Sequence, residues 1–155
     1  MNQLKKSEIL ACSPEDISSW VKKTSFPNFH SHQIQDWIYK KQEQCPQKMK
    51  NIPNHLRTAL AKDFDSNLCE IVSRVDSTDK ATKLLLKSSD SRVFEAVILR
   101  YEKRTSLCVS SQIGCKMGCK FCATGTMGII GNLTAGEILE QVVHANAISK
   151  IRNIV

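Results

Sequence analysis

The sequence predicts an α/β protein in three parts. These are a small amino-terminal helical domain over residues 1–64, a β-hairpin extension over residues 65–104 and the start of a parallel (β/α) barrel over residues 105–155, truncated at the carboxy terminus. Apolar residues recur at helical spacing up to Phe64, and short runs rich in Val, Ile, Leu and Thr follow from Asn67. The final segment shows the order strand, loop, helix, strand, which is the repeating unit of a parallel barrel.

The first third of the chain predicts three short helices. Ser13 is a capping residue, Pro14 suits the first helical position, and two acidic residues follow in the first turn. A second helix is expected over residues 31–41, and a third opens at Pro53. We expect the helices to pack around two tryptophans in a compact domain that ends near Phe64. The expected core-facing positions are Ile17, Trp20, Val21, Ile34, Trp37, Ile38, Leu56, Ala59 and Leu60.

Strands are expected next, over residues 68–75, 81–87, 92–101 and 105–111. The polar breaks VDSTDK, KSSDS and YEKRT separate them, so the first strands form hairpins.

A helix and a further strand are expected to close the chain. Thr134 and Glu137 have the spacing of a capping box, and the helix that follows should bury one apolar side. Residues 151–155 are the next strand. The expected buried side of the helix consists of Ile138, Leu139, Val142 and Val143.

Three cysteines in one loop, Cys115, Cys119 and Cys122, are the strongest chemical signal. Their C-x3-C-x2-C spacing suits a [4Fe–4S] cluster with one iron left open for a small molecule. We expect Gly114, Gly118 and Gly125 to let the backbone turn around the cluster, and Lys116 and Lys120 to add positive charge beside it. Phe121 lies between two ligands, where it can shield the cluster or contact an adenine ring.

Other interpretations of the cysteines and histidines remain open. A zinc site could use Cys108 as a fourth ligand, although structural zinc sites usually pair two short hooks across a longer gap. His30 and His32 have no Cys or His partner at ligand spacing, so we expect surface or capping residues. The remaining cysteines, Cys12, Cys45 and Cys69, are interpreted as ordinary thiols.

The segment LCVSSQIGCKMGCKFCATGTMGIIG, residues 107–131, resembles the cluster-binding region of the RlmN/Cfr family of radical S-adenosylmethionine (radical SAM) enzymes. CVSSQIGC directly before the cysteine triplet makes the resemblance specific to this family, and a fainter likeness runs upstream through FPNFHSHQIQDWIYKK. The resemblance implies methylation of C2 or C8 of an adenine in large-subunit ribosomal RNA, with C2 expected here. It also implies a [4Fe–4S] cluster on Cys115, Cys119 and Cys122, and S-adenosylmethionine as cofactor.

The resemblance further assigns two catalytic residues. Glu95 stands thirteen residues before Cys108, the spacing of the family's proposed proton acceptor. Glu95 also lies in a largely apolar row of a strand, where desolvation would raise its pKa, although the pattern alone favours a solvent-facing glutamate. Cys108 matches a cysteine that forms a transient disulfide with a methyl-carrying cysteine near the carboxy terminus. Without the resemblance, Cys108 would be a small buried hydrophobe.

The length of 155 residues is too short for the full family pattern, which implies a longer barrel with a glycine-rich cofactor segment and the methyl-carrying cysteine. We therefore expect the amino-terminal half of such an enzyme, inactive alone.

The composition predicts a soluble cytoplasmic protein, because no apolar run could span a membrane and the first residues lack a signal-peptide core. A plastid or mitochondrial location is the alternative if the true amino terminus differs. Seven cysteines, an odd number, argue for a reducing compartment rather than a disulfide framework.

The net charge of +7 favours an acidic partner. Ribosomal RNA, and transfer RNA as a further candidate, are the substrates that the resemblance implies, with a reductant such as flavodoxin or ferredoxin, no membrane and a monomeric enzyme. An RNA-binding module with a structural zinc loop and no catalysis is the alternative function. The lysines that could contact phosphate, or could simply be a solvated helix face, are Lys22, Lys23, Lys40, Lys41, Lys48 and Lys50.

Overall fold

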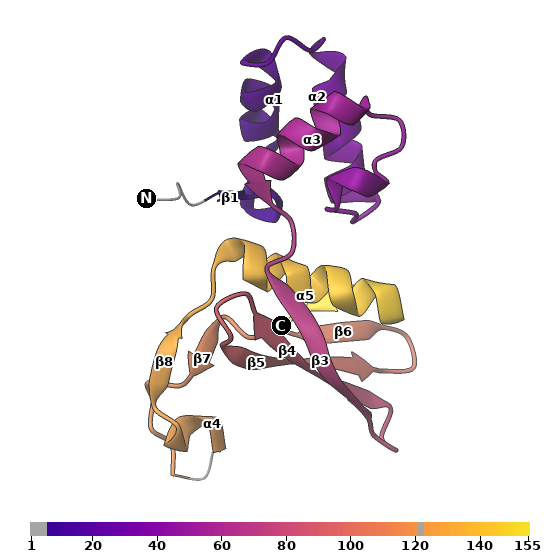
Figure 1. Cartoon of the computed structure of the whole chain (residues 1–155). Coiled ribbons are helices and arrows are strands. Elements are labelled where there is room, and N and C mark those ends of the chain that lie inside the picture. Colours follow the sequence, from indigo (N-terminus) through magenta and orange to yellow (C-terminus); the bar gives the residue numbers. More distant parts are fainter. Residues whose placement is uncertain (1–5, 121–122) are drawn as a thin grey trace. The chain divides into compact units, whose positions relative to one another are not determined.

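A computed structural model of the chain describes residues 6–120 and 123–155. The chain forms two compact units, Met1–Leu68 and Cys69–Val155 (Figure 1). The first unit is mainly helical, and the second combines sheets with helices. The coarse expectation of a mixed α/β chain is therefore confirmed.

The first unit contains the three expected helices. Helix α1 spans Pro14–Lys22, α2 spans Phe29–Gln35 and continues as a π-helical turn over Asp36–Lys40, and α3 spans Asn54–Asp63. Two single 3₁₀ turns lie at Ile9–Ala11 and Pro46–Lys48. Strand β1 (Ser7–Glu8) pairs in parallel with β2 (Phe64–Asp65), which brings the two ends of this unit together.

The start of α1 follows the predicted capping pattern. The Ser13 hydroxyl accepts a hydrogen bond from the backbone N–H of Asp16 at 3.1 Å, and the Asp16 carboxylate accepts one from the N–H of Ser13 at 2.8 Å. These two bonds satisfy backbone donors that a helix start leaves unpaired. The accepted bonds also hold the pKa of Asp16 below its usual value.

The two tryptophans do not form the core of the first unit, contrary to expectation. Trp20 and Trp37 are only half-buried, because each indole N–H reaches a surface carboxylate or amide, of Asp63 and Asn51 respectively. Aliphatic side chains fill the interior instead, and Trp20 packs edge-on against Phe64 at its margin. The buried apolar residues of this unit are Ile9, Leu10, Ile17, Val21, Ile34, Ile38, Met49, Ile52, Leu56, Leu60, Phe64 and Leu68.

The second unit is built on a five-stranded sheet in the order β3-β4-β5-β6-β9. The strands are β3 (Cys69–Asp76), β4 (Ala81–Ser88), β5 (Val93–Arg100), β6 (Thr105–Cys108) and β9 (Asn153–Ile154). The first three pairings are antiparallel, and β6 pairs with β9 in parallel. The expected hairpins and the expected final strand are therefore present.

Helix α5 (Ala135–Ile148) covers one face of this sheet (Figure 1). Alternate residues of β4 and β5 are buried, among them Leu84, Leu86 and Ile98, and Val142 of α5 packs against the same core. The alternation is the period of a strand with one covered face. The opposite face of the sheet carries the more exposed residues of these two strands.

The buried side of α5 is more polar than expected. Leu139 is 43% exposed, whereas Glu137, Glu140 and Gln141 are at most 5% exposed. Apolar periodicity missed these positions because their side chains bond to groups on other elements: Arg92 reaches Glu137 at 2.9 Å, for example. Buried polar groups are tolerated where they are paired in this way.

A separate two-stranded ribbon carries the cysteine loop. Strand β7 (Gln112–Gly114) pairs antiparallel with β8 (Ile129–Asn132). The short helix α4 (Ala123–Thr126) belongs to the connection between these strands and lies beyond their ends (Figure 1). Among the helices that the structure describes, none is long and apolar enough to cross a membrane.

Candidate active site

The cysteine loop begins at a backbone turn that only glycine can form. Gly114 has φ +75°, and a Cβ on it would lie 1.9 Å from the carbonyl oxygen of Gly128. The Cys115 N–H donates to that same carbonyl at 3.0 Å, so the two ends of the loop are joined directly before the first cysteine. Gly118 and Gly128 also have positive φ, at 63° and 68°. Gly125 lies within α4, so it does not act as a turn glycine of this kind.

Two cysteines of the loop, Cys115 and Cys119, belong to the described residues. Cys115 and Cys119 are free and half-buried, which leaves their thiols able to bind metal, and the Met117 N–H points to Cys115 Sγ at 3.5 Å. Backbone N–H groups beside ligand sulfurs are a usual part of such sites. The other two residues expected here, Cys122 and Phe121, lie outside the described residues.

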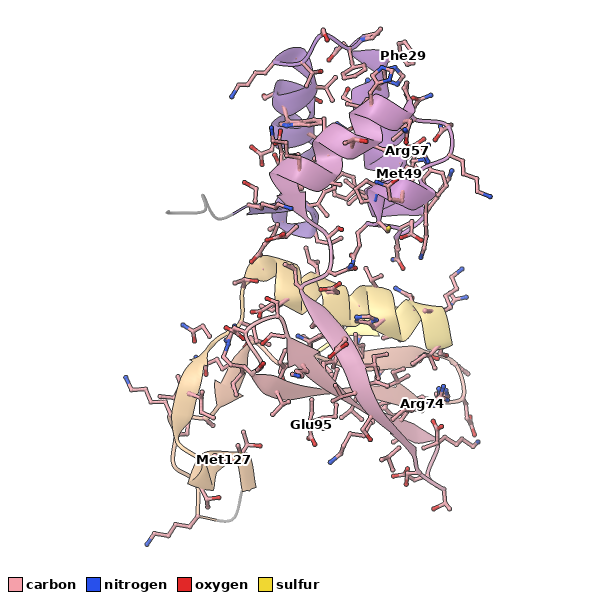
Figure 2. The ribbon with its side chains drawn as sticks, in the orientation of Figure 1. Phe29, Met49, Arg57, Arg74, Glu95 and Met127 are labelled. Atoms are coloured by element: carbon pink, nitrogen blue, oxygen red, sulfur yellow. The ribbon has the colours of Figure 1, made fainter. Side chains whose placement is uncertain are left out.

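Glu95 lies on the open face of the sheet. It belongs to β5 and is exposed (Figure 2). Its carboxylate Oε1 is 3.2 Å from Nζ of Lys83 on β4. Both side chains are about half exposed, so the apolar row of the strand does not bury Glu95. The strand pattern by itself, which favoured a solvent-facing glutamate, describes its position correctly.

Cys108 lies on the same open face as Glu95. It pairs with Val97 across β5 and β6, and residues directly opposite in an antiparallel pair point to the same side. Val97 and Glu95 are two residues apart on β5, so they also share a face. Diagonal neighbours of this kind lie about 7–8 Å apart. Cys108 is exposed, so the expectation of a small buried hydrophobe is wrong.

Ser110 connects this face to the cysteine loop. Its hydroxyl donates to the backbone carbonyl of Glu95 at 2.7 Å. The buried side-chain amide of Gln141 on α5 forms two hydrogen bonds with the Ser110 backbone. It accepts from the Ser110 N–H and donates to the Ser110 carbonyl, each at 2.9 Å. The segment between Cys108 and Cys115 is therefore fixed to both β5 and α5.

Four residues of this region, Ser110, Gln141, Lys83 and Gly128, have no role predicted from the sequence. Ser110 lies inside the CVSSQIGC run, so the motif could have singled it out. Gln141 is 31 residues away from Ser110 in the sequence, and no local sequence pattern predicts the contact between them. Only the strand register reveals the pairing of Lys83 with Glu95.

The described lysines of the first unit are all exposed, but they are not equally available to a partner. Lys40 forms an ion pair with Asp36 at 2.7 Å, and Lys48 forms one with Glu43 at 3.0 Å. Lys41 lies over the ring of Trp37, 3.6 Å from its centroid. Lys22, Lys23 and Lys50 have no ion-pair partner among the residues that the structure describes, so their ammonium groups are the more available ones.

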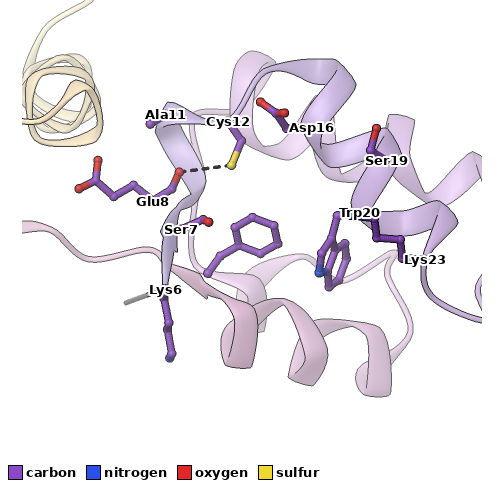
Figure 3. A pocket seen from close by; sticks show the side chains of 10 residues that line it. Lys6, Ser7, Glu8, Ala11, Cys12, Asp16, Ser19, Trp20 and Lys23 are labelled. Atoms are coloured by element: carbon purple, nitrogen blue, oxygen red, sulfur yellow. Dashed lines mark hydrogen bonds between the residues drawn. The ribbon is translucent and has the colours of Figure 1, made fainter. Parts of the chain in front are cut away.

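A pocket of about 590 Å³ opens on the first unit (Figure 3). Lys6, Lys23, Glu8 and Asp16 line it together with Trp20, so its charge is balanced rather than basic. Burial, reinforced by the neighbouring acids, raises the pKa of the Cys12 thiol in its wall. This wall offers no uniformly positive surface to phosphate.

His30 is buried, which corrects the expectation of a surface or capping residue. Its ring lies 4.2 Å from that of Phe29, centroid to centroid, and its Nδ1 is 2.7 Å from the Gln33 side-chain oxygen. His32 is exposed, as expected.

Comparison with known proteins identifies relatives for both units. Residues 7–65 match the family model described as the ribosomal RNA large subunit methyltransferase N-terminal domain. The chain is 41% identical over 150 residues to a probable dual-specificity RNA methyltransferase RlmN of Clostridium perfringens, covering 95% of this chain and 43% of the relative. It is 42% identical over 149 residues to a protein of the same description from Carboxydothermus hydrogenoformans, covering 94% and 44%.

A solved structure agrees with these relatives. The crystal structure of a radical SAM methyltransferase from Sphaerobacter thermophilus matches with a TM-score of 0.87 and 32% identity, over 96% of this chain and 45% of that one. The chain thus spans less than half the length of each of these three proteins.

Proposed function

Since the chain belongs to the RlmN family, we propose that it carries the cluster loop and part of the reaction face of a radical SAM methyltransferase. The proposed substrate is an adenine of large-subunit ribosomal RNA, methylated at C2, and transfer RNA is a second substrate to test. The proposed setting is a parallel barrel that begins with β6, α5 and β9 and continues in the part of the relatives that this chain does not match.

One observation supports the proposal most directly. The segment from Cys108 to Cys115 joins the open face of the sheet to the cysteine loop, and Ser110 fixes it to the backbone carbonyl of Glu95 through a 2.7 Å hydrogen bond. A reaction that uses a cluster and a protein base needs both beside one substrate atom, and a rigid connection provides that. A zinc-stabilised RNA-binding module has no need of such a connection.

The proposed cluster ligands are Cys115, Cys119 and Cys122. When bound, a [4Fe–4S] cluster with an open iron supplies the electron that cleaves S-adenosylmethionine reductively. Phe121 is the proposed contact for the cofactor's adenine. The exposed Lys116 and Lys120 add positive charge beside the anionic thiolates.

Glu95 and Cys108 have separate proposed roles on the open face. The Glu95 carboxylate accepts the ring proton of the adenine, and the Lys83 ammonium 3.2 Å away orients it. The exposed Cys108 thiol is accessible to a cysteine from the unmatched part of the enzyme, with which it forms the transient disulfide.

The first unit is the proposed RNA-binding accessory domain, because exposed lysines can neutralise phosphates without reading bases. We further propose a monomeric cytoplasmic enzyme that takes its electrons from a flavodoxin or ferredoxin.

Anaerobic reconstitution tests the cluster assignment. The chain should take up about four iron and four sulfide and turn brown, as a [4Fe–4S] centre requires. Replacing any one of Cys115, Cys119 and Cys122 by Ala should abolish this, and Cys108→Ala should not. A colourless protein that holds zinc in this loop would contradict the proposal.

A chimera tests the roles of the open face. This chain would be joined to the part of the C. perfringens relative that it does not match, and incorporation of labelled methyl into ribosomal RNA would be measured. Glu95→Ala should stall the reaction with RNA covalently attached to protein, because the ring proton is not removed. Lys87→Ala, a change of another lysine on the open face of β4, is the matched control and should turn over normally. Normal turnover by Glu95→Ala would remove this glutamate from the reaction.

A further inference from the structure

A cysteine, a glutamate and a histidine meet where α5 packs on the start of β3. Cys69 is the first residue of β3, and Glu140 and His144 lie one turn apart on α5. Their ligand atoms all lie within 4.8 Å of one another. Cys69 and Glu140 are buried, and His144 is half-buried. We propose that these three side chains bind one Zn²⁺ ion, at a site that shares no residue with the cysteine loop.

The donor set is typical of zinc. Thiolate, imidazole and carboxylate are the three ligand types that zinc takes, and three protein ligands with a fourth position left to water form a usual coordination. The mixed set excludes the hard cations Mg²⁺ and Ca²⁺, which prefer oxygen alone. Glu140 and His144 are spaced i, i+4, so one helix face presents both to the same point.

The backbone of Cys69 holds the ring of His144 in place. Its Nε2 lies 3.0 Å from the backbone carbonyl of Cys69. A carbonyl can only accept, so Nε2 carries the proton and Nδ1 keeps the lone pair that a metal needs. Metal-ligating histidines usually donate their other ring N–H to a carbonyl or carboxylate in this way.

The backbone of β3 also holds the carboxylate beside the sulfur. The Cys69 N–H donates to Glu140 Oε2 at 2.8 Å. Burial raises the pKa of the Cys69 thiol, and the charge of Glu140 and a hydrogen bond to it raise the pKa further, so the metal-free thiol is protonated. When zinc binds, the S–H bond breaks, the proton leaves to solvent and the zinc–sulfur bond forms.

The competing explanation for this cluster of side chains is a structural contact that binds no metal. The hydrogen bonds of His144 and Glu140 to the Cys69 backbone would by themselves fasten α5 to β3. Substitutions that keep these bonds but weaken or remove the metal ligands distinguish the two. Glu140→Gln keeps an oxygen that accepts from the Cys69 N–H, and His144→Gln keeps an N–H that donates to the Cys69 carbonyl.

The test uses the full chain with Cys115, Cys119 and Cys122 all replaced by Ala, so that the loop cannot bind the added metal. Co²⁺ is the spectroscopic probe, followed by displacement with Zn²⁺. We expect one metal per chain, a sulfur-to-cobalt charge-transfer band and the visible bands of four-coordinate cobalt. His144→Gln and Glu140→Gln should each weaken zinc binding by at least about tenfold to hundredfold. Cys12→Ser, a change of a thiol in the other unit, should leave it unchanged.

A second measurement needs no substitution in the loop. The chain has four histidines, and His144 is the one that belongs to the second unit. In the side-chain ¹H–¹⁵N spectrum of the unaltered chain, zinc should shift the ring nitrogens of His144 and leave those of His30, His32 and His55 in place. If the His144 signals do not shift, or if His144→Gln does not weaken zinc binding, the zinc site is wrong. The three side chains would then only hold α5 to β3.

Discussion

Gly114 and Gly118 show how differently two glycines of one loop are constrained. Both have positive φ, a region where other residues are strained by about 1–2 kcal/mol. A Cβ at Gly118 would meet nothing within 4 Å, whereas at Gly114 it would overlap the Gly128 carbonyl. That carbonyl accepts from the N–H of Cys115, so relieving the overlap would move the first cluster ligand.

Gly114→Ala should therefore destabilise the second unit by more than the backbone strain alone. We expect a loss of about 2–5 kcal/mol in the free energy of urea unfolding, since overpacking adds about 1–3 kcal/mol to the strain. Iron uptake on reconstitution should fall as well. Gly118→Ala is the matched control, with a loss near 1 kcal/mol from strain alone. Equal losses for the two variants would show that the close approach to Gly128 is unimportant.

Helix α5 links the elements of the second unit through its polar side chains. At its start the Thr134 hydroxyl accepts from the N–H of Glu137 at 3.1 Å, and Glu137 accepts from the N–H of Thr134 at 2.8 Å. Glu137 also binds Arg92 at 2.9 Å, which connects the cap to the turn before β5. Farther along the helix, Gln141 holds Ser110, so the helix that follows the cysteine loop also fixes the segment that precedes it.

Thr134→Ala should lower the unfolding free energy of the second unit by about 1 kcal/mol, the usual effect of losing a helix cap. Thermal melting followed by circular dichroism would measure it. Thr134→Ser keeps the hydroxyl and is the control, expected to melt close to the unaltered chain. The cap is unimportant if Ala and Ser melt alike.

The β4–β5 turn makes the hairpin sensitive to acid. The hydroxyl of Ser88, and then Arg92, hold the pKa of Asp90 below its usual value. A carboxyl whose pKa is lowered on folding stabilises the fold above its unfolded pKa of about 3.9 and loses that contribution as the pH falls through the folded value.

Asp90→Asn should therefore reduce the loss of stability between pH 5 and pH 2. Urea unfolding at several pH values would measure this loss. At neutral pH the free energies of unfolding of the variant and the unaltered chain should differ by less than about 1 kcal/mol, because the Asp90 side chain is largely exposed. Asn cannot titrate, so the curve of the variant should be flatter in acid. An unchanged pH dependence would show that Asp90 is not one of the responsible groups.

At the scale of the whole molecule, the chain consists of two compact units. The first matches the methyltransferase N-terminal domain model, and the second carries the cysteine loop, Glu95 and Cys108. Association of the first unit with RNA should depend on its lysines and hence on salt.

Replacing Lys22 and Lys23 by Gln should reduce the salt dependence of RNA binding by the full chain. Removing one lysine–phosphate interaction lowers the slope of log K against log salt by about 0.7–0.9. The control with the same charge change replaces Lys40 and Lys48, whose side chains already pair with Asp36 and Glu43. Filter binding at several salt concentrations would measure both. RNA binding that stays constant from low to high salt would contradict a phosphate-based interface.

The sequence by itself determined the local features of this protein. The capping residues Ser13 and Thr134, the strand alternation of β4 and β5 and the cysteine spacing are visible in it, because each depends on residues a few positions apart. The tertiary structure alone decided which distant residues meet. Strand register places Cys108 on the same face as Glu95, and the packing of α5 buries Glu140 and Gln141 against backbone groups that need partners. Apolar periodicity predicts which side of a helix is buried. It does not predict a buried polar side chain whose hydrogen-bond partner is a backbone group far away in the sequence.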